Sequence, residues 1–303
     1  MKKVLKVIGI VLLTVVVIVA GFLGFISFRP AAPYHYTQKT NTDGDLEAKY
    51  LSSGSFKTAR LSADAEGTLE KYTIYYPTEL EASDRSYPAV IMVNGTGIPA
   101  SKYKSVLDHL ASWGFVVIGN EDPSSGNGDS TDTTLMYLLS ENDNHDSIFY
   151  HRIDTENIGL EGHSQGGAGV FSALTIKEHR DLYKAAVALS PTQEEMAAAL
   201  GWPYELEKIN VPVFLLAGTQ GEFETQTVLP IEAMNAMYEK IPSSKAMARK
   251  VGMEHGQMLY SADGYATAWL LWYLQGDEEA AKVFAGENPE IINNSLYQDQ
   301  RIN

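Results

Sequence analysis

The sequence contains no cysteine among its 303 residues. This absence excludes disulfide bonds, thiolate nucleophiles and cysteine-ligated zinc sites. Basic residues are also scarce, since 23 lysines and arginines stand against 38 acidic residues and give a formal charge of −15. A chain this acidic is not expected to bind nucleic acid. Internal repeats are lacking too, and 45% of the residues are hydrophobic, which is enough for one large domain with a full core.

A long uncharged stretch is present at the N-terminus. Residues 7–28 carry no charge and follow three lysines. About 20 apolar residues span a bilayer as a helix, and basic residues before the span keep the N-terminus inside. We therefore expect residues 1–29 to be an uncleaved signal anchor that makes the membrane a partner, with the rest of the chain extracytoplasmic. A cleaved signal and secretion is the alternative. Residues 30–45 are then expected to be a linker, and residues 46–303 the folded domain.

Short apolar runs alternate with helical patterns along the remainder of the chain. Strands are predicted where the residues alternate or form short continuous apolar runs, at 69–76, 89–93, 115–118, 157–161, 185–189, 211–217 and 246–251. Helices are predicted from apolar residues at helical spacing, at 102–113, 133–140, 165–178, 228–240 and 265–274. This alternation predicts an α/β fold with a mostly parallel central sheet flanked by helices.

One turn between a predicted strand and a predicted helix carries a serine. The strand runs into Gly162-His163-Ser164-Gln165-Gly166, and apolar residues at helical spacing follow. The pattern G-x-S-x-G between a strand and a helix is a nucleophile elbow. Its glycines are needed because the turn is so tight that side chains there would collide with the strand and the helix. The sequence therefore predicts that Ser164 is a nucleophile.

A serine hydroxyl needs a base within hydrogen-bond reach, and the base needs an acid that orients it. Two histidines follow Ser164 in the chain. His255 lies in a glycine-flanked loop after the last predicted strand and is the predicted base. His179 lies at the polar end of the helix after the elbow, where it faces solvent or caps that helix. His163 is expected to pack under the turn, and we assign it no proton transfer.

The acid and the oxyanion hole are predicted from the loops after two other strands. Glu222 follows the strand VPVFLLA and is the predicted acid, and Glu224 is the alternative because it lies only two residues further on. An oxyanion hole needs two backbone N–H groups. Gln165 supplies one at the N-terminus of the elbow helix, and Thr96, in the glycine-rich turn after AVIMV, is the candidate for the other. The carboxyl ends of parallel strands meet at one edge of the sheet, so these residues are expected to converge.

A polar loop at residues 120–132 contains four acidic residues without regular ligand spacing. We interpret it as a solvated loop, and a cation site such as one for calcium is the alternative. The predicted chemistry requires no metal and no cofactor. The acidic segment after Gly276 indicates a surface helix and loop.

Three stretches together resemble a known family. They are GHSQGG, PAVIMVNGTG and LASWGFVVIGNED. They are similar to the bacterial cutinase-like and polyester-hydrolase branch of the α/β-hydrolases, with its dienelactone-hydrolase and chlorophyllase relatives. The resemblance covers roughly residues 72–274 and implies an α/β-hydrolase fold. In that family the oxyanion residue follows a dipeptide that corresponds to Asn94-Gly95, which implies Thr96.

The resemblance also bears on the acid and on the shape of the site. The family acid lies four residues past a glycine, and counting from Gly218 gives Glu222. The chain departs from the family at Gln165, often methionine there, and at Thr96, an aromatic residue in many members. Only about 20 residues separate Ser190 from Val211, so no large cap domain is expected, and Trp202 and Tyr204 either line the site or belong to the core.

These observations predict a serine hydrolase that cleaves carboxylic esters through an acyl-enzyme intermediate. Its substrate would be a small-molecule ester or a lipid or polymer ester. The same residues would serve an acyltransferase, in which an alcohol replaces water. A non-catalytic binding module on a hydrolase scaffold is a further alternative.

Overall fold

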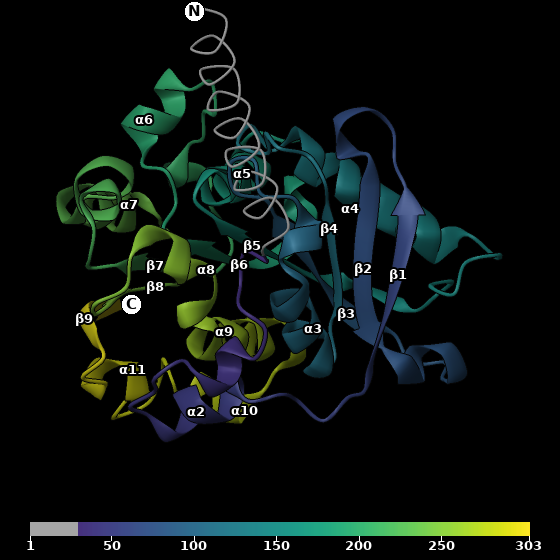
Figure 1. Cartoon of the computed structure of the whole chain (residues 1–303), viewed down its shortest axis with the longest axis horizontal. Helices are drawn as coiled ribbons and strands as arrows, with labels where there is room; N and C mark the ends of the chain where they lie inside the picture. Colours follow the sequence, from purple (N-terminus) through teal and green to yellow (C-terminus); the bar gives the residue numbers. More distant parts are fainter. Residues whose placement is uncertain (1–29) are drawn as a thin grey trace, which may run out of the picture.

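The computed structural model describes residues 30–303, which contain a nine-stranded sheet with helices on both faces (Figure 1). The strand order is β1-β2-β4-β3-β5-β6-β7-β8-β9. Neighbouring strands from β4 to β8 run parallel, whereas the pairs β1–β2, β2–β4 and β8–β9 are antiparallel. The strands are β1 (Thr58–Asp64), β2 (Lys71–Pro77), β3 (Tyr87–Val93), β4 (Val116–Asn120), β5 (Ile153–His163), β6 (Tyr183–Leu189), β7 (Val213–Gly218), β8 (Lys245–Lys250) and β9 (Tyr297–Ile302).

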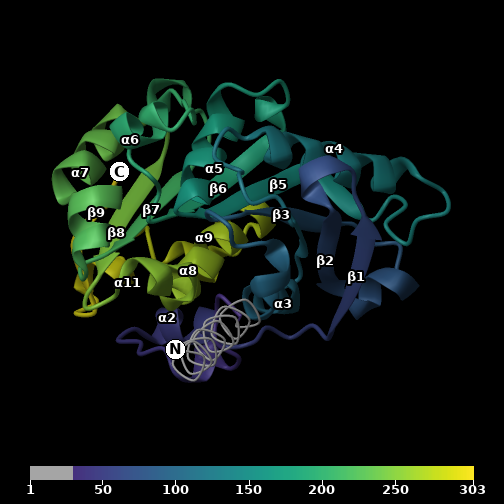
Figure 2. The same cartoon turned by 45° about the horizontal axis from the view of Figure 1, so that its top comes forward.

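Two groups of helices cover the two faces of the sheet (Figure 2). One face packs against α4 (Asp129–Asp143), α5 (Gln165–Thr175), α6 (Glu194–Ala199) and α7 (Ile231–Lys240). The other packs against α2 (Asp45–Leu51), α3 (Lys104–Ser112), α8 (Met258–Ser261), α9 (Asp263–Gln275), α10 (Glu278–Ala281) and α11 (Glu290–Asn293). Two hydrophobic cores result, one on each side of the sheet, as expected when helices cover both faces of a parallel sheet.

The central strands form where the sequence is continuously apolar. Every residue of β3 and of β7 is buried, because each of these strands has helices on both sides. Apolar residues are favoured on both faces of such strands. The predicted α/β architecture, a mostly parallel central sheet flanked by helices, is confirmed.

Two edge strands were not predicted from the sequence. β1 pairs with β2, and β9 pairs with β8, so each completes one side of the sheet. Both are rich in polar residues, and most of their residues are partly or fully exposed. An edge strand with little burial has no strong apolar pattern, and polar side chains there also protect against edge-to-edge aggregation. The segment after Gly276, expected to be a helix and loop, therefore also contributes a strand.

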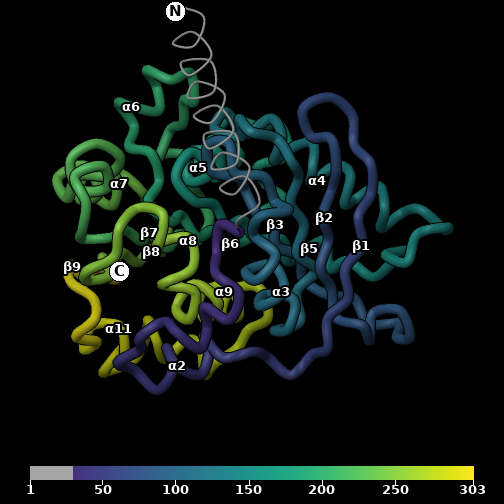
Figure 3. Tube along the Cα trace, in the orientation of Figure 1, coloured from purple at the N-terminus to yellow at the C-terminus, as the bar shows by residue number. Residues whose placement is uncertain are grey.

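The expected linker is part of the folded domain. Ala32 and Tyr36 are almost completely buried, and the Tyr36 hydroxyl donates a hydrogen bond to Asp263 at the start of α9. The following helix α2 is held in turn, because Glu290 of α11 accepts hydrogen bonds from the backbone N–H groups of Leu46 and Glu47, both at 2.8 Å. Figure 3 shows α2 beside α11, near the other end of the chain. We call residues 30–44 the N-terminal strap. Its mostly polar composition indicated a linker, although Ala32 and Tyr36 anchor it to the domain.

No helix within residues 30–303 is long and apolar enough to cross a membrane. This finding contradicts the expected localisation as a single-pass membrane protein. The predicted anchor itself, residues 1–29, lies outside the residues that the structure describes.

The segment between β6 and β7 contains only α6 and a short 3₁₀ helix, Leu206–Lys208. The expectation that no large cap domain is inserted there agrees with this arrangement. The carboxyl ends of β3, β5, β7 and β8 are thus left without a separate domain above them.

Candidate active site

Ser164 occupies a strained turn between β5 and α5. Its backbone has φ 61° and ψ −120°, a conformation that costs a non-glycine residue energy and that is found at functional sites. The flanking glycines are required by space. A Cβ at Gly162 would lie 2.4 Å from the carbonyl oxygen of Gly166, and one at Gly166 would lie 2.1 Å from the carbonyl oxygen of Val93. The turn therefore has the geometry predicted from the G-x-S-x-G pattern, with a partly exposed Ser164 at its tip.

His255 lies in the loop after β8 and is hydrogen-bonded to a carboxylate. Its Nδ1 is 2.6 Å from Oε2 of Glu224. The Glu224 side chain is completely buried, whereas that of His255 is 14% exposed. An Nδ1–H group that donates to a carboxylate leaves Nε2 free to accept a proton. A general base needs this tautomer, with the hydrogen on Nδ1.

The second oxygen of Glu224 is also fully engaged. Oε1 accepts hydrogen bonds from the Ser190 hydroxyl at 2.6 Å and from the Gly218 backbone N–H at 2.7 Å. Burial alone raises the pKa of Glu224, but the hydrogen bonds from His255, Ser190 and Gly218 outweigh it and hold this pKa below its ordinary value. Glu224 is therefore held as a carboxylate against the imidazole.

Glu222, the predicted acid, does not contact His255. It is solvent-exposed and precedes a π-helix at Phe223–Val228. The turn of this helix places Glu224 inward under the end of β7 and leaves Glu222 outward. His255 is paired instead with Glu224, the alternative, because counting from Gly218 gives a position along the chain but not the direction of the side chain. Nothing in the local sequence distinguishes the two.

The two expected oxyanion donors are backbone N–H groups without acceptors. No residue among 30–303 accepts a hydrogen bond from the N–H of Thr96 or of Gln165. Gln165 is the first residue of α5, where the N–H groups of a helix have no intrahelical partner. Thr96 is exposed in the loop after β3, and its neighbour Gly95 donates its own N–H to the Tyr103 hydroxyl at 2.8 Å. Both donors are therefore free to bind a negatively charged oxygen.

His163, which was expected to pack under the turn, also contacts the loop of His255. It is 8% exposed, and its Nε2 is 2.8 Å from the backbone carbonyl oxygen of His255. The centroids of the two imidazole rings are 4.6 Å apart. This contact also shows that the loop of His255 lies directly beside the elbow, because His163 precedes Ser164 in the chain.

The remaining candidates are not part of this site. His179 is paired through Nδ1 with Asp132 at 3.0 Å. The other acidic residues of the polar loop at 120–132 also have partners within the protein: Glu121 accepts hydrogen bonds from Ser101, Asp122 accepts one from Ser124, and Asp129 pairs with Lys177. Within residues 30–303 no group of three or more acidic or histidine side chains is placed to hold a metal ion. The interpretation of this loop as a cation site is not supported.

The two aromatic residues after β6 contribute mainly to packing. The Tyr204 hydroxyl donates to the carbonyl oxygen of Thr192 at 2.8 Å, and its ring packs 5.1 Å from that of Phe171. Trp202 packs on Gly126, where an added Cβ would lie 2.4 Å from the indole. Tyr204 therefore belongs to the core, and Trp202 is fixed against the polar loop.

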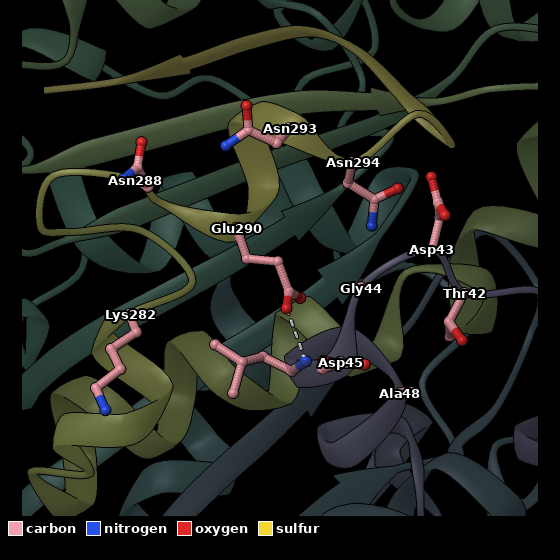
Figure 4. Close-up of a pocket in the computed structure, with 11 residues that line it drawn as sticks. Thr42, Asp43, Gly44, Asp45, Ala48, Lys282, Asn288, Glu290, Asn293 and Asn294 are labelled. Carbon is pink, nitrogen blue, oxygen red and sulfur yellow. Dashed lines mark hydrogen bonds between the residues drawn. The ribbon is translucent and has the colours of Figure 1, made fainter.

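A cavity of about 700 Å³ lies away from Ser164, between α2 and α11 (Figure 4). Its lining is polar, and Glu290 reaches across it to the N-terminus of α2. The hydrogen bonds of Glu290 connect the N-terminal strap to the C-terminal region. We therefore interpret this cavity as part of the interface between the N-terminal strap and the C-terminal region.

Comparisons with known proteins identify the family of this chain. A family model described as PETase, PET hydrolase-like, matches residues 31–301. The chain is 29% identical over 269 residues to a cutinase of Thermobifida fusca (strain YX), with 82% of this chain and 79% of the relative covered. It is 27% identical over 255 residues to cutinase est1 of Thermobifida alba, with 78% and 75% covered.

A bis(hydroxyethyl) terephthalate hydrolase of Streptomyces coelicolor is 30% identical over 178 residues, which cover 57% of this chain and 50% of that protein. The family match includes the elbow, the His255 loop, the N-terminal strap from residue 31 and nearly all of β9. The protein is thus a member of the PET hydrolase-like family of carboxylic-ester hydrolases, which have the α/β-hydrolase fold.

Proposed function

We propose that this protein is a serine esterase whose triad consists of Ser164, His255 and Glu224. The observation that carries the proposal is the 2.6 Å hydrogen bond between His255 Nδ1 and the buried Glu224 carboxylate, in a loop that touches the elbow through His163. A histidine so oriented, beside a strained serine and two free backbone donors, is the arrangement that acyl transfer through a serine requires.

The chemistry follows from these positions. The Ser164 hydroxyl attacks the ester carbonyl carbon and transfers its proton to Nε2 of His255, while Glu224 stabilises the resulting imidazolium. The negative charge that develops on the carbonyl oxygen is stabilised by the backbone N–H groups of Thr96 and Gln165, assisted by the N-terminal end of α5. His255 then returns the proton to the leaving alcohol. Water, activated by the same histidine, hydrolyses the acyl-enzyme to the free acid.

The substrate class is proposed from two observations. Relatives are named as cutinases and as a hydrolase of bis(hydroxyethyl) terephthalate, so esters of extended acids or of small diols are the first candidates. The exposed Thr96 loop and the short segment between β6 and β7 leave the site accessible. An open site accepts an extended or polymeric ester, which a large lid would exclude.

The test is ester hydrolysis by the complete chain. Turnover of p-nitrophenyl acetate, butyrate and octanoate and of bis(hydroxyethyl) terephthalate is measured for the wild type and Ser164→Ala, with Ser62→Ala, an exposed serine of β1, as the matched control. Loss of the nucleophile should lower kcat by about 10⁴-fold or more, whereas Ser62→Ala should match the wild type. Retention of activity in Ser164→Ala would refute the assignment.

A further inference from the structure

His163 is the point at which three loops of the site meet. It ends β5 directly before Ser164, and its Nε2 is 2.8 Å from the carbonyl oxygen of His255. On its other side lies Gly95, which precedes Thr96: a Cβ built there would be 3.5 Å from Nδ1 of His163 and 3.3 Å from its carbonyl oxygen. One side chain therefore contacts the base loop and packs against the oxyanion loop.

The hydrogen bond shows which ring nitrogen of His163 carries a hydrogen. A carbonyl oxygen can only accept, so the Nε2–H group of His163 donates a hydrogen bond to the backbone carbonyl oxygen of His255. Burial, together with repulsion from His255, lowers the pKa of His163 to about 3. The ring of His163 is therefore neutral at neutral pH.

Neutrality matters because His255 becomes positively charged during the reaction. The two ring centroids are only 4.6 Å apart, and a second positive charge at that distance would oppose the imidazolium that Glu224 stabilises. A neutral donor fixes the backbone of His255 without this repulsion. A lysine or arginine could make the same hydrogen bond but would carry the charge.

We propose that His163 is a positioning residue, whose neutral Nε2–H group holds the His255 backbone and sets the distance between this base and Ser164. This inference rests on the proposed function, since His255 is the base only if the triad is correct. Among residues 30–303, the only hydrogen-bond partner of the His163 side chain is the carbonyl oxygen of His255. Its effect passes through the carbonyl oxygen of His255 and through the packing of Gly95 beside the Thr96 donor.

Two substitutions separate the hydrogen bond from the packing. His163→Phe fills a similar volume but has no N–H donor, whereas His163→Gln is neutral and retains one. kcat and KM for p-nitrophenyl butyrate are measured per active site, counted by titration with a fluorophosphonate. Since a misplacement of about 1 Å can cost about 100-fold in rate, His163→Phe should lower kcat per titrated site by 30- to 100-fold, with KM changed less than about twofold. His163→Gln should restore kcat to within about fivefold of the wild type.

A second readout does not depend on turnover. The proton shared by His255 Nδ1 and Glu224 should give a low-field proton resonance in the NMR spectrum of the wild type, and this resonance should shift or broaden in His163→Phe and return in His163→Gln. His145→Phe, a substitution of an exposed histidine, is the matched control for both readouts. An unchanged resonance in His163→Phe, or a variant with fewer titratable sites but normal kcat per site, would overturn the proposal. If the wild type neither turns over nor labels, the proposed function fails and the role of His163 fails with it, whereas an active wild type whose resonance is unchanged in His163→Phe refutes only the inference about His163.

Discussion

Replacement of Glu224 by glutamine tests the triad at the residue where sequence and structure disagree. Oε1 of the wild-type carboxylate accepts from Ser190 and Gly218, and Oε2 accepts from His255. In Glu224→Gln the single amide oxygen is expected to stay at the first position, because the Gly218 backbone N–H there can only donate and needs an acceptor. The amide NH₂ group then faces Nδ1 of His255.

This arrangement reverses the tautomer of the base. An NH₂ group donates to Nδ1, so the proton of the neutral imidazole moves to Nε2, where it blocks proton transfer from Ser164. The imidazolium also loses its countercharge. An analogous Asp-to-Asn change in a serine protease triad lowers kcat by about 10⁴-fold, and we expect a loss of about 10³- to 10⁴-fold for Glu224→Gln. That corresponds to roughly 4–5 kcal/mol of transition-state stabilisation.

The assay is kcat and KM for p-nitrophenyl butyrate, with thermal unfolding measured in parallel. Glu222→Gln is the matched control, because it is the same chemical change two residues away on an exposed side chain. It should alter kcat by less than about twofold. If Glu222→Gln abolishes activity while Glu224→Gln retains it, the pairing of His255 with Glu224 does not describe the working enzyme.

Three further outcomes are expected. Deletion of residues 1–44 should lower the free energy of unfolding by roughly 3–5 kcal/mol relative to deletion of residues 1–29, because it removes the buried Ala32 and Tyr36; equal denaturation midpoints would show that the strap contributes nothing. Thr96→Pro removes a backbone N–H and should lower kcat by about 10²- to 10³-fold, while Thr96→Ala keeps that N–H and should be nearly neutral; a large loss in Thr96→Ala would point to the side chain instead. Burial raises the pKa of Asp263 from 3.8 to about 7, so its contribution to stability is fully present below pH 4 and is lost as the pH rises towards 7. A rise in pH from 4 to 7 should therefore lower the free energy of unfolding of the wild type by up to roughly 4 kcal/mol more than that of Asp263→Asn. Denaturant titrations at each pH measure this difference, and parallel pH profiles would contradict it.

The sequence alone determined those features that depend on local pattern. Continuous apolar runs predicted the parallel strands, since a strand covered on both faces must be apolar along its whole length. The elbow was also local, because the close approach of Gly162 to Gly166 and the strain at Ser164 arise within a few residues of the chain. The order of Ser164, an acid and His255 followed from those strands.

Tertiary structure decided the features that depend on direction and on distant contacts. A π-helix turns Glu224 inward and Glu222 outward, although the two residues have the same chemistry and nearly the same position in the chain. The strap is held by Tyr36, whose partner Asp263 lies 227 residues away. The contact between His163 and His255 joins loops 92 residues apart. Spacing along the chain identifies which side chains can reach one edge of the sheet, but only packing in three dimensions determines which of them meet.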